Sequence, residues 1–88
     1  MEHPRFSLVV PVFDPPVDAL AATIVSITTQ TFPDFECVLV DDASTDPAVG
    51  AELDRRVATD DRLRLVRRDS NGGIAAATND GLEEVALP

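Results

Sequence analysis

The sequence predicts an α/β fold in which three strands and three helices alternate around a parallel sheet. Two apolar runs, at residues 6–12 and 35–40, are rich in β-branched and aliphatic side chains, as in strands that are buried on both faces. Segments with helical periodicity separate the strand-like segments, and a third strand and a third helix complete the series. This alternation is typical of parallel sheets with right-handed crossovers, so the chain is expected to form one half of a doubly wound sheet.

The first helix is expected between the two apolar runs. Asp14 is a candidate cap for its N-terminus, because Pro15 and Pro16 are tolerated in a first helical turn. Apolar side chains then recur at helical spacing and predict one stripe that packs on the sheet. Its members are Val17, Leu20, Ala21, Ile24 and Ile27. The stripe stops near residues 30–31, and residues 33–34 predict the turn into the second strand.

The second helix and the third strand follow the second apolar run. Asp46 is a candidate cap and Pro47 would occupy the first helical position, an arrangement common at helix N-termini. Apolar residues at four-residue spacing predict the buried face of this helix, which ends at residues 59–61. They are Val49, Leu53 and Val57. Residues 62–67 alternate arginine and aliphatic side chains, which predicts an edge strand whose arginines form a solvated face.

A turn at residues 69–73 is expected to open the third helix. The inner face of this helix is predicted to carry four larger side chains. They are Ile74, Thr78, Leu82 and Val85. Residues 1–5 are expected to form a disordered lead-in, and residues 6–88 a single, partial domain.

Length, charge and cysteine content limit the class of protein. A chain of 88 residues suffices for one small domain. It carries 16 acidic and 7 basic residues, for a net charge of −9, so nucleic acid is not an expected partner. No apolar run approaches the ~20 residues of a membrane span, and no transmembrane segment is expected. Cys37, the single cysteine, is expected to be a small buried hydrophobe and fits a reducing cytoplasm.

Polar and aromatic side chains follow the first two strands at the edge where open α/β sheets bind ligands. Phe13 and Asp14 follow the first strand, while Asp41 and Asp42 close the second. Because neighbouring parallel strands bring their carboxyl ends together, Phe13 and Asp42 are expected to face one crevice. An aromatic ring and a carboxylate would suit a pyrimidine base. The alternative, that Phe13 is core and the carboxylates cap the next helix, stays open on spacing alone.

A second candidate element is the turn Asn71-Gly72-Gly73, which precedes the third helix. Free backbone N–H groups at a helix N-terminus can hold an anion, so these residues are a weak anion-site candidate. The turn lacks the Gly-Lys-Ser/Thr ending of the phosphate-binding loop, and no G-x-G-x-x-G follows the first strand. A plain helix N-terminus is the simpler interpretation of this turn.

Several motifs in register resemble the start of a family 2 glycosyltransferase. The similarity runs from about residue 6 to residue 86, and the number of motifs in order makes it specific. The segments that carry it are residues 7–14 with Pro11-Val12-Phe13-Asp14, residues 26–36, Val40-Asp41-Asp42-Ala43-Ser44-Thr45-Asp46, Asp61-Arg62-Leu63-Arg64, and Asn71-Gly72-Gly73-Ile74-Ala75 through Asn79.

The resemblance implies the nucleotide-binding half of a GT-A fold, a three-layer, Rossmann-like β-α-β-α-β-α unit with a parallel sheet. Members move a sugar from a nucleotide diphosphate donor to an acceptor with inversion at the anomeric carbon. Carried over by position, Pro11 and Phe13 would border the base, and Asp42 would bind the uracil or thymine edge. Asp41 would be structural. Asp14 is added as a nucleotide-site candidate, and residues 71–79, with Asn71, Gly72 and Gly73, would line the donor crevice.

Two departures from the family pattern are visible. Thr78 stands where many members carry an arginine. The Asp-x-Asp motif that holds Mg²⁺ or Mn²⁺ and the diphosphate is expected beyond Pro88, as is the catalytic base. The chain is therefore expected to be the N-terminal part of an enzyme, to hold no catalytic residue or metal ligand, and to be inactive alone.

Two other classes of protein compete with this interpretation. A response-regulator receiver places its paired aspartates after the first strand and needs a lysine, which this chain lacks. A non-catalytic module that binds nucleotide sugars or assists assembly remains the alternative.

The resemblance also implies partners and a location. They are a UDP- or dTDP-sugar, a glycan or lipid acceptor in cell-envelope polysaccharide synthesis, and a place in the cytoplasm at the inner face of the membrane. Because the family's fourth strand would lie beside the first one, the 88-residue chain is expected to self-associate along its first strand.

Overall fold

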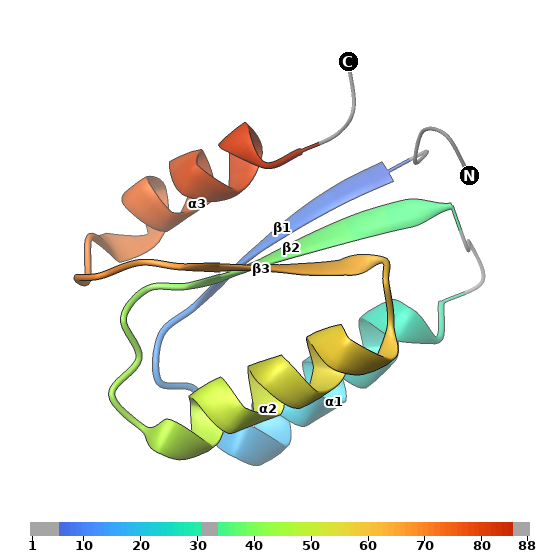
Figure 1. Cartoon of the computed structure of the whole chain (residues 1–88), viewed down its shortest axis with the longest axis horizontal. Coiled ribbons are helices and arrows are strands. Elements are labelled where there is room, and N and C mark those ends of the chain that lie inside the picture. The colour runs from blue at the N-terminus through green and yellow to red at the C-terminus, as the bar shows by residue number, and fades with distance from the viewer. Residues whose placement is uncertain (1–5, 31–33, 86–88) are drawn as a thin grey trace.

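The computed structural model describes residues 6–30 and 34–85, which form a parallel sheet with three helices (Figure 1). The expected lead-in at residues 1–5 and the turn through residue 33 lie outside these residues. The predicted alternation is confirmed. The elements are β1 (Phe6–Val12), α1 (Val17–Thr28), β2 (Phe35–Asp41), α2 (Pro47–Thr59), β3 (Leu63–Arg67) and α3 (Gly73–Glu83).

The sheet has the order β1-β2-β3, with all three strands parallel. The central strand, β2, is buried along its whole length, as its continuous apolar sequence predicts. Asp41 pairs with Val12 on one side and with Arg67 on the other. The carboxyl ends of the three strands therefore meet at one edge of the sheet, and β3 lies at a lateral edge as predicted.

Helices cover both faces of the sheet and make three layers (Figure 1). Helices α1 and α2 pack on one face, where Cys37 and Leu39 of β2 join the larger core cluster. Helix α3 covers the other face, where Val38 and Val40 contact Ala77. Successive residues of β2 thus serve opposite layers, as the pleat of a strand requires. Burial raises the pKa of the Cys37 thiol to about 11, in agreement with its predicted role as a buried hydrophobe.

The predicted inner face of α3 is wrong for its two largest members, whereas Thr78 and Val85 are half-buried. Ile74 and Leu82 are 77% and 58% exposed, whereas Ala77 and Gly81 are buried against the sheet. A Cβ atom on Gly81 would lie 2.3 Å from Cγ1 of Val9 and 2.9 Å from Cγ2 of Val40. The helix approaches the sheet too closely for large side chains, so small residues form its contact face.

The predicted role of Asp14 as a helix cap is also wrong. Helix α1 begins at Val17 with Pro16 at the N-cap position and no side-chain cap. Asp14 has a φ of 44°, and its Oδ1 accepts hydrogen bonds from the backbone amides of Thr45 at 2.8 Å and Asp46 at 2.9 Å. These amides follow β2, so Asp14 joins the two loops at the carboxyl edge of the sheet.

Helix α2 begins as predicted. Asp46 is its N-cap and accepts a hydrogen bond from the amide of Ala48 at 2.9 Å, with Pro47 as the first helical residue. A helix with a side-chain cap and a proline at its first position has a defined start. The loop that follows Asp41 is therefore held by β2 at one end and by the capped start of α2 at the other.

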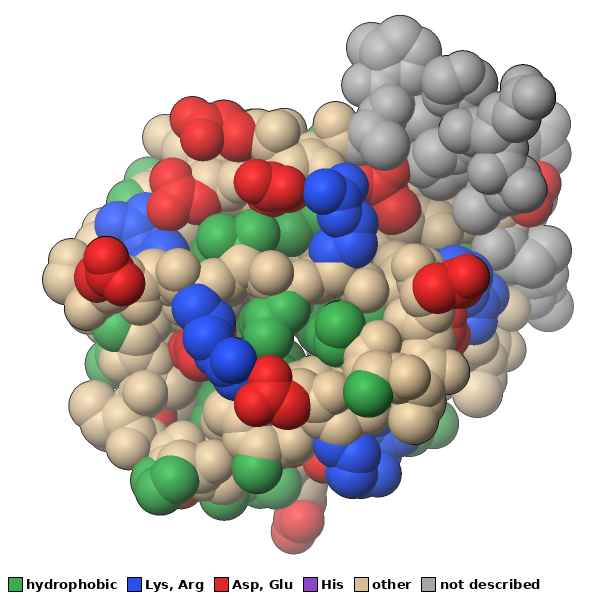
Figure 2. Space-filling view, in the orientation of Figure 1, with side chains coloured by type: hydrophobic (Ala, Val, Ile, Leu, Met, Phe, Trp, Pro, Cys, Tyr) green, Lys and Arg blue, Asp and Glu red, His purple; other side chains and the backbone are tan. Residues whose placement is uncertain are grey.

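The arginines around β3 are ion-paired, which corrects the prediction of a simply solvated face. Arg64 and Arg67 pair with Glu84 and Asp54, each at 3.0 Å. Arg62, just before β3, pairs with Asp60 at 2.7 Å. Figure 2 shows basic and acidic side chains interspersed on this side of the molecule, with apolar groups between them.

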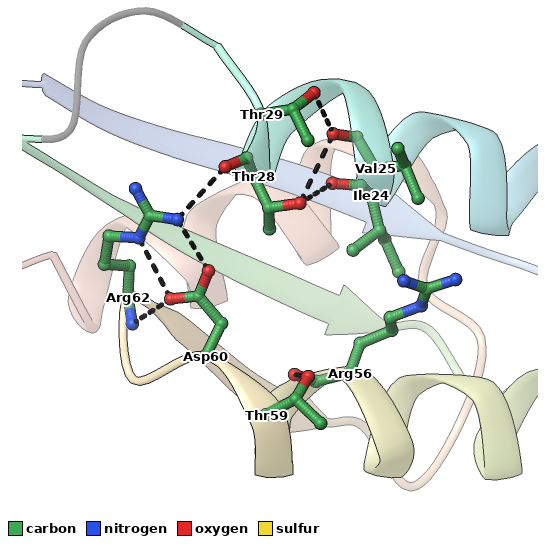
Figure 3. Close-up of polar contacts among 8 residues, drawn as sticks. All are labelled: Ile24, Val25, Thr28, Thr29, Arg56, Thr59, Asp60 and Arg62. Carbon is green, nitrogen blue, oxygen red and sulfur yellow. Dashed lines mark hydrogen bonds and ion pairs between the residues drawn. The ribbon is translucent and has the colours of Figure 1, made fainter.

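Arg62 also connects three elements of the fold, and Figure 3 shows its contacts with Thr28 and Asp60. Its Nη2 donates to the backbone carbonyl of Thr28 at the end of α1, at 3.1 Å, and its guanidinium lies 4.4 Å from the ring centroid of Phe35. The Arg62 guanidinium lowers the pKa of Asp60, chiefly through their hydrogen bonds. One side chain thus joins α1, the start of β2 and the turn into β3.

Candidate functional site

A cavity of about 340 Å³ lies at the carboxyl ends of β1 and β2, beside the start of α3. It contains five of the predicted nucleotide-site residues together with Val12 and Ile74. Its lining is Pro11, Val12, Phe13, Asp42, Asn71, Gly73 and Ile74. The carboxyl ends of the strands thus lie around one hollow, which is where parallel α/β sheets bind ligands.

Phe13 gives this cavity an aromatic wall. The residue is 52% exposed although it follows the buried Val12. It therefore does not belong to the core, which removes that part of the alternative left open by its spacing. An exposed ring at the rim of a cavity can stack on a planar ligand.

Asp42 gives the cavity a carboxylate that is 3% exposed. Its Oδ1 accepts from the amide of Gly72 at 3.0 Å and its Oδ2 from the amide of Gly73 at 2.9 Å, and Nε of Arg68 forms an ion pair with Oδ1 at 2.9 Å. Two amides and a guanidinium therefore compensate its burial, as a buried carboxylate requires. Asp42 also fixes the start of α3 against the end of β2.

The prediction of free amides at residues 71–73 is therefore wrong. The amides of Gly72 and Gly73 both donate to Asp42, and that of Gly73 also lies 3.1 Å from Oδ1 of Asn71. A buried carboxylate left without donors would cost more than exposed amides that bind water. The N-terminus of α3 thus binds the Asp42 carboxylate of the same chain.

The hydrogen bonds to Asp42 leave part of its acceptor capacity open. A carboxylate offers about four lone-pair positions on its two oxygens. Among the described residues, one amide donates to Oδ1 and one to Oδ2, and Arg68 forms an ion pair with Oδ1. A ligand can therefore donate a hydrogen bond to this carboxylate.

Asp14 and Gly72 are the predicted site residues that do not line the cavity. The hydrogen bond from the amide of Asp46, followed by that from the Thr45 hydroxyl, lowers the pKa of Asp14. Gly72 instead lies beside Arg68, since a Cβ atom at this position would be 2.6 Å from Nη2 of Arg68. Both residues support the loops around the cavity.

Asp41 holds the turn that follows β2. Its Oδ1 accepts from the amide of Ser44 at 2.9 Å, and Nε of Arg67 lies 3.9 Å from its Oδ2. Ala43 has a φ of 62°, a left-handed conformation that this short turn requires. These contacts agree with the structural role implied for Asp41.

Arg68 is the main residue that the sequence analysis missed. It is bound to Asp42 and, through Nη1, to Asp80 of α3 at 2.8 Å, and its side chain is only 18% exposed. A sequence pattern does not fix the strand register to the residue. In the structure Arg67 pairs with Asp41, which brings the next residues, Arg68 and Asp42, together. Ile74 belongs to residues 71–79, which were expected to line the crevice, although its side chain was also assigned to the core.

The described residues do not form a site for a metal ion. No group of three His, Cys, Asp or Glu side chains among them is placed to hold one. Asp41 and Asp42 already accept hydrogen bonds from protein donors. Within the same residues, no helix is long and apolar enough to cross a membrane.

Comparison with known proteins assigns the chain to a family. The profile of glycosyl transferase family 2 matches residues 7–86, and the chain belongs to that family. The chain is 38% identical over 79 residues to the O-antigen biosynthesis protein RfbC of Myxococcus xanthus. That match covers 90% of this chain and 6% of RfbC.

Two solved structures share the fold. The mannosyltransferase PcManGT from Pyrobaculum calidifontis, in complex with GDP-Man and Mn²⁺, superposes with a TM-score of 0.83 at 28% identity. The match covers 96% of this chain and 25% of that one. TarS from S. aureus gives 0.75 at 27% identity, with coverages of 93% and 24%. The expected GT-A fold is thus confirmed, and the chain spans about a quarter of either structure.

Proposed function

We propose that this chain forms the nucleotide-binding part of an inverting glycosyltransferase that uses a UDP- or dTDP-sugar. The observation that carries the proposal is the placement of the Phe13 ring and the Asp42 carboxylate on one cavity at the carboxyl edge of the sheet. Membership of glycosyl transferase family 2 supplies the class of reaction.

The cavity suits a base because it offers a stacking surface and one acceptor. A base that stacks on Phe13 would gain about 1–3 kcal/mol. A ring N–H donated to Asp42 would add about 1.5–3 kcal/mol, as for other hydrogen bonds to charged groups. Together these contacts would orient the nucleoside and leave the diphosphate directed away from the buried carboxylate.

A pyrimidine base is proposed because the resemblance to family 2 glycosyltransferases places the uracil or thymine edge at Asp42. These bases present one ring N–H between two carbonyl groups, and the Asp42 carboxylate can accept that N–H. PcManGT was solved with GDP-Man, so the family fold itself accommodates a guanine nucleotide, and the base must be tested directly.

We propose that the ligands of Mg²⁺ or Mn²⁺, and the catalytic base, belong to a part of the parent protein other than these 88 residues. The support is that PcManGT was solved with Mn²⁺ and that this chain matches 25% of its length. The metal would neutralise the diphosphate there. A glycan or lipid of the cell envelope is the proposed acceptor, since RfbC is named for O-antigen biosynthesis, and the inner face of the cytoplasmic membrane is the proposed location.

Calorimetric titration of the chain with UDP, dTDP, GDP and ADP tests the proposal. The pyrimidine nucleotides are expected to bind more tightly than either purine nucleotide. Phe13→Ala should weaken their binding about tenfold, which is about 1.4 kcal/mol. Phe6→Ala is the matched control, because Phe6 is 50% exposed at the opposite end of β1. Equal affinities for all four nucleotides, or equal effects of the two variants, would refute the proposal.

A further inference from the structure

We propose that Asp14 positions the Phe13 ring for the base of the nucleotide, although Asp14 itself does not line the cavity. The inference rests on the proposed function and assigns a positioning residue to the same site. It follows from three observations: the hydrogen bonds that join Asp14 to the loop after β2, the left-handed backbone beside two cavity residues, and the exposure of Phe13.

Phe13 lies between two anchored residues. Before it, the carbonyl of Val12 accepts a hydrogen bond from the amide of Asp42 at 2.8 Å. After it, the amide of Asp14 donates to Oγ of Ser44 at 2.9 Å. The Phe13 side chain is half exposed, so core packing fixes its ring only in part. The direction of the ring therefore depends on the backbone at residues 12 and 14.

The Asp14 carboxylate completes the second anchor. Its Oδ1 accepts from the amides of Thr45 at 2.8 Å and Asp46 at 2.9 Å, and its Oδ2 accepts from the Thr45 hydroxyl at 2.8 Å. We call these contacts, together with the bond to Ser44, the loop clamp. Because the loop clamp uses both the amide and the carboxylate of Asp14, this residue cannot rotate without breaking several hydrogen bonds.

The backbone conformation indicates the same role. Asp14 has a φ of 44° and Ala43 has a φ of 62°, and residues other than glycine rarely adopt such left-handed values. Each directly follows a residue that lines the cavity, which is Phe13 in one case and Asp42 in the other. Unfavourable backbone conformations persist where the surrounding structure holds them, and they cluster at ligand sites. The loop clamp holds Asp14 in this conformation.

A ring that is already held binds a base more tightly than a mobile ring. A nucleotide that must immobilise a side chain on binding loses about fivefold in affinity. Without the loop clamp, Phe13 would still be present, but the nucleotide would have to order it. Asp14 therefore raises the affinity for the base through Phe13 and without a contact of its own.

Titration with UDP compares variants of the loop clamp. Asp14→Gly removes the carboxylate but tolerates the left-handed backbone, and it should weaken UDP binding about fivefold. Asp14→Asn should keep most of the affinity, because its amide oxygen can accept from the same backbone amides and asparagine also tolerates this conformation. Ser44→Ala removes only the acceptor for the Asp14 amide and should have an intermediate effect.

A double-mutant cycle tests whether Asp14 acts through Phe13. In a Phe13→Ala background, Asp14→Gly should weaken UDP binding by less than about twofold, because the ring that the loop clamp holds is absent. A residue that only supports the fold would have the same effect in both backgrounds. So would a residue that contacts the nucleotide itself.

Asp60→Ala is the matched control. The Asp60 carboxylate also accepts a hydrogen bond from a backbone amide, that of Arg62 at 3.0 Å, but Asp60 precedes β3 at the opposite edge of the sheet. Its loss should lower the stability and leave the UDP affinity unchanged. Heteronuclear spectra identify the variants that are folded, and Ser44→Ala replaces Asp14→Gly in both comparisons if the glycine variant does not fold. Relaxation of the Phe13 amide ¹⁵N should show more motion in Asp14→Gly than in Asp60→Ala.

The outcomes distinguish the inference from the proposed function. Equal UDP affinities of the wild type and Asp14→Gly, or an undiminished effect of Asp14→Gly in the Phe13→Ala background, would overturn the role of Asp14 while nucleotide binding stands. An equal loss of affinity in Asp60→Ala would also contradict the inference, because lower stability alone would then suffice. A wild-type chain that binds no nucleotide would overturn both.

Discussion

Asp14 and Asp42 show how single carboxylates organise the carboxyl edge of the sheet. Each follows a strand, and each accepts hydrogen bonds from the backbone amides of a different loop. Asp14 accepts them from residues 45–46, and Asp42 from residues 72–73. Sequence reasoning selected both residues but assigned Asp14 to the wrong amides. The two carboxylates connect all three strand ends, which explains why the cavity is formed within one short chain.

Stability is expected to fall at acid pH because of such carboxylates. The pKa of Asp14 is lowered by the amide of Asp46, that of Glu52 by Arg56, and that of Asp60 by Arg62. A lowered folded-state pKa favours the charged form. The contribution of these carboxylates to the free energy of unfolding is therefore complete above their unfolded-state pKa of about 4. It is lost as the pH falls through their folded-state pKa.

Urea unfolding between pH 7 and pH 2.5 measures this effect. The free energy of unfolding should decrease below about pH 4. Asp14→Asn should flatten part of that decrease, whereas Asp18→Asn, in the exposed first turn of α1, should leave it unchanged. A variant at position 14 with the full wild-type decrease would contradict the role given to its contacts.

At the scale of elements, α3 depends on small residues for its contact with the sheet. Gly81→Ala should destabilise the fold by about 1–3 kcal/mol, as overpacking does, because its Cβ would overlap Val9 and Val40. Gly50→Ala is the matched control within a helix, since its Cβ would meet only Arg67, at 3.5 Å. That variant should be stabilising by about 0.5–1 kcal/mol. Thermal unfolding would measure both, and equal effects would contradict the close packing of α3.

The helices and strands could be predicted from the sequence because their apolar residues recur with a clear helical or strand period. The continuous apolar run of β2, the alternation in β3 and the cap at Asp46 each correspond to one local rule, and the structure confirms them. The inner face of α3 could not be predicted, because Ile74 and Leu82 obey the helical rule as well as Ala77 and Gly81 do. The distance between helix and sheet decides between them, and no single segment encodes it.

The candidate site was predictable to a similar extent. Strand order and the rule for carboxyl ends place Phe13 and Asp42 together, and the structure brings both to one cavity. The polar partners of Asp42 are residues 68, 72 and 73, about 30 positions away in the chain. Their arrangement follows from the register of β3 against β2, which a sequence pattern does not specify to the single residue.

For the whole molecule, β1 is an open edge of the described sheet. The Phe6 amide and the Val12 carbonyl bond toward the β2 side. The backbone groups of the alternate residues Ser7 and Val9 therefore face outward, while Pro11 lacks a donor. Apolar edges of this kind invite pairing, so the 88-residue chain is expected to self-associate along β1.

Sedimentation at micromolar concentration measures this association. Phe6→Lys should weaken it, because a charge on the half-exposed start of β1 opposes pairing. Val25→Lys is the control: Val25 is 41% exposed, but it lies on α1. A monomeric wild type, or a Phe6→Lys chain that associates equally well, would exclude the edge as an interface.

The isolated chain is also expected to transfer no sugar, even with Mg²⁺ or Mn²⁺ supplied. The described residues contain no cluster suited to a metal, so the charge that develops on the diphosphate would not be stabilised. Acceptor-dependent release of UDP from a UDP-sugar by the purified 88-residue chain would contradict this expectation.

The central claim is that the base of the donor binds between Phe13 and Asp42. Isotope-filtered NMR on labelled chain with unlabelled UDP tests it most directly, because it reports contacts between specific protons. Nuclear Overhauser effects are expected from uracil H5 and H6 to the Phe13 ring and the Ile74 methyl groups, which line the same cavity. Contacts to other residues, or no contacts and no shift changes at millimolar UDP, would contradict it.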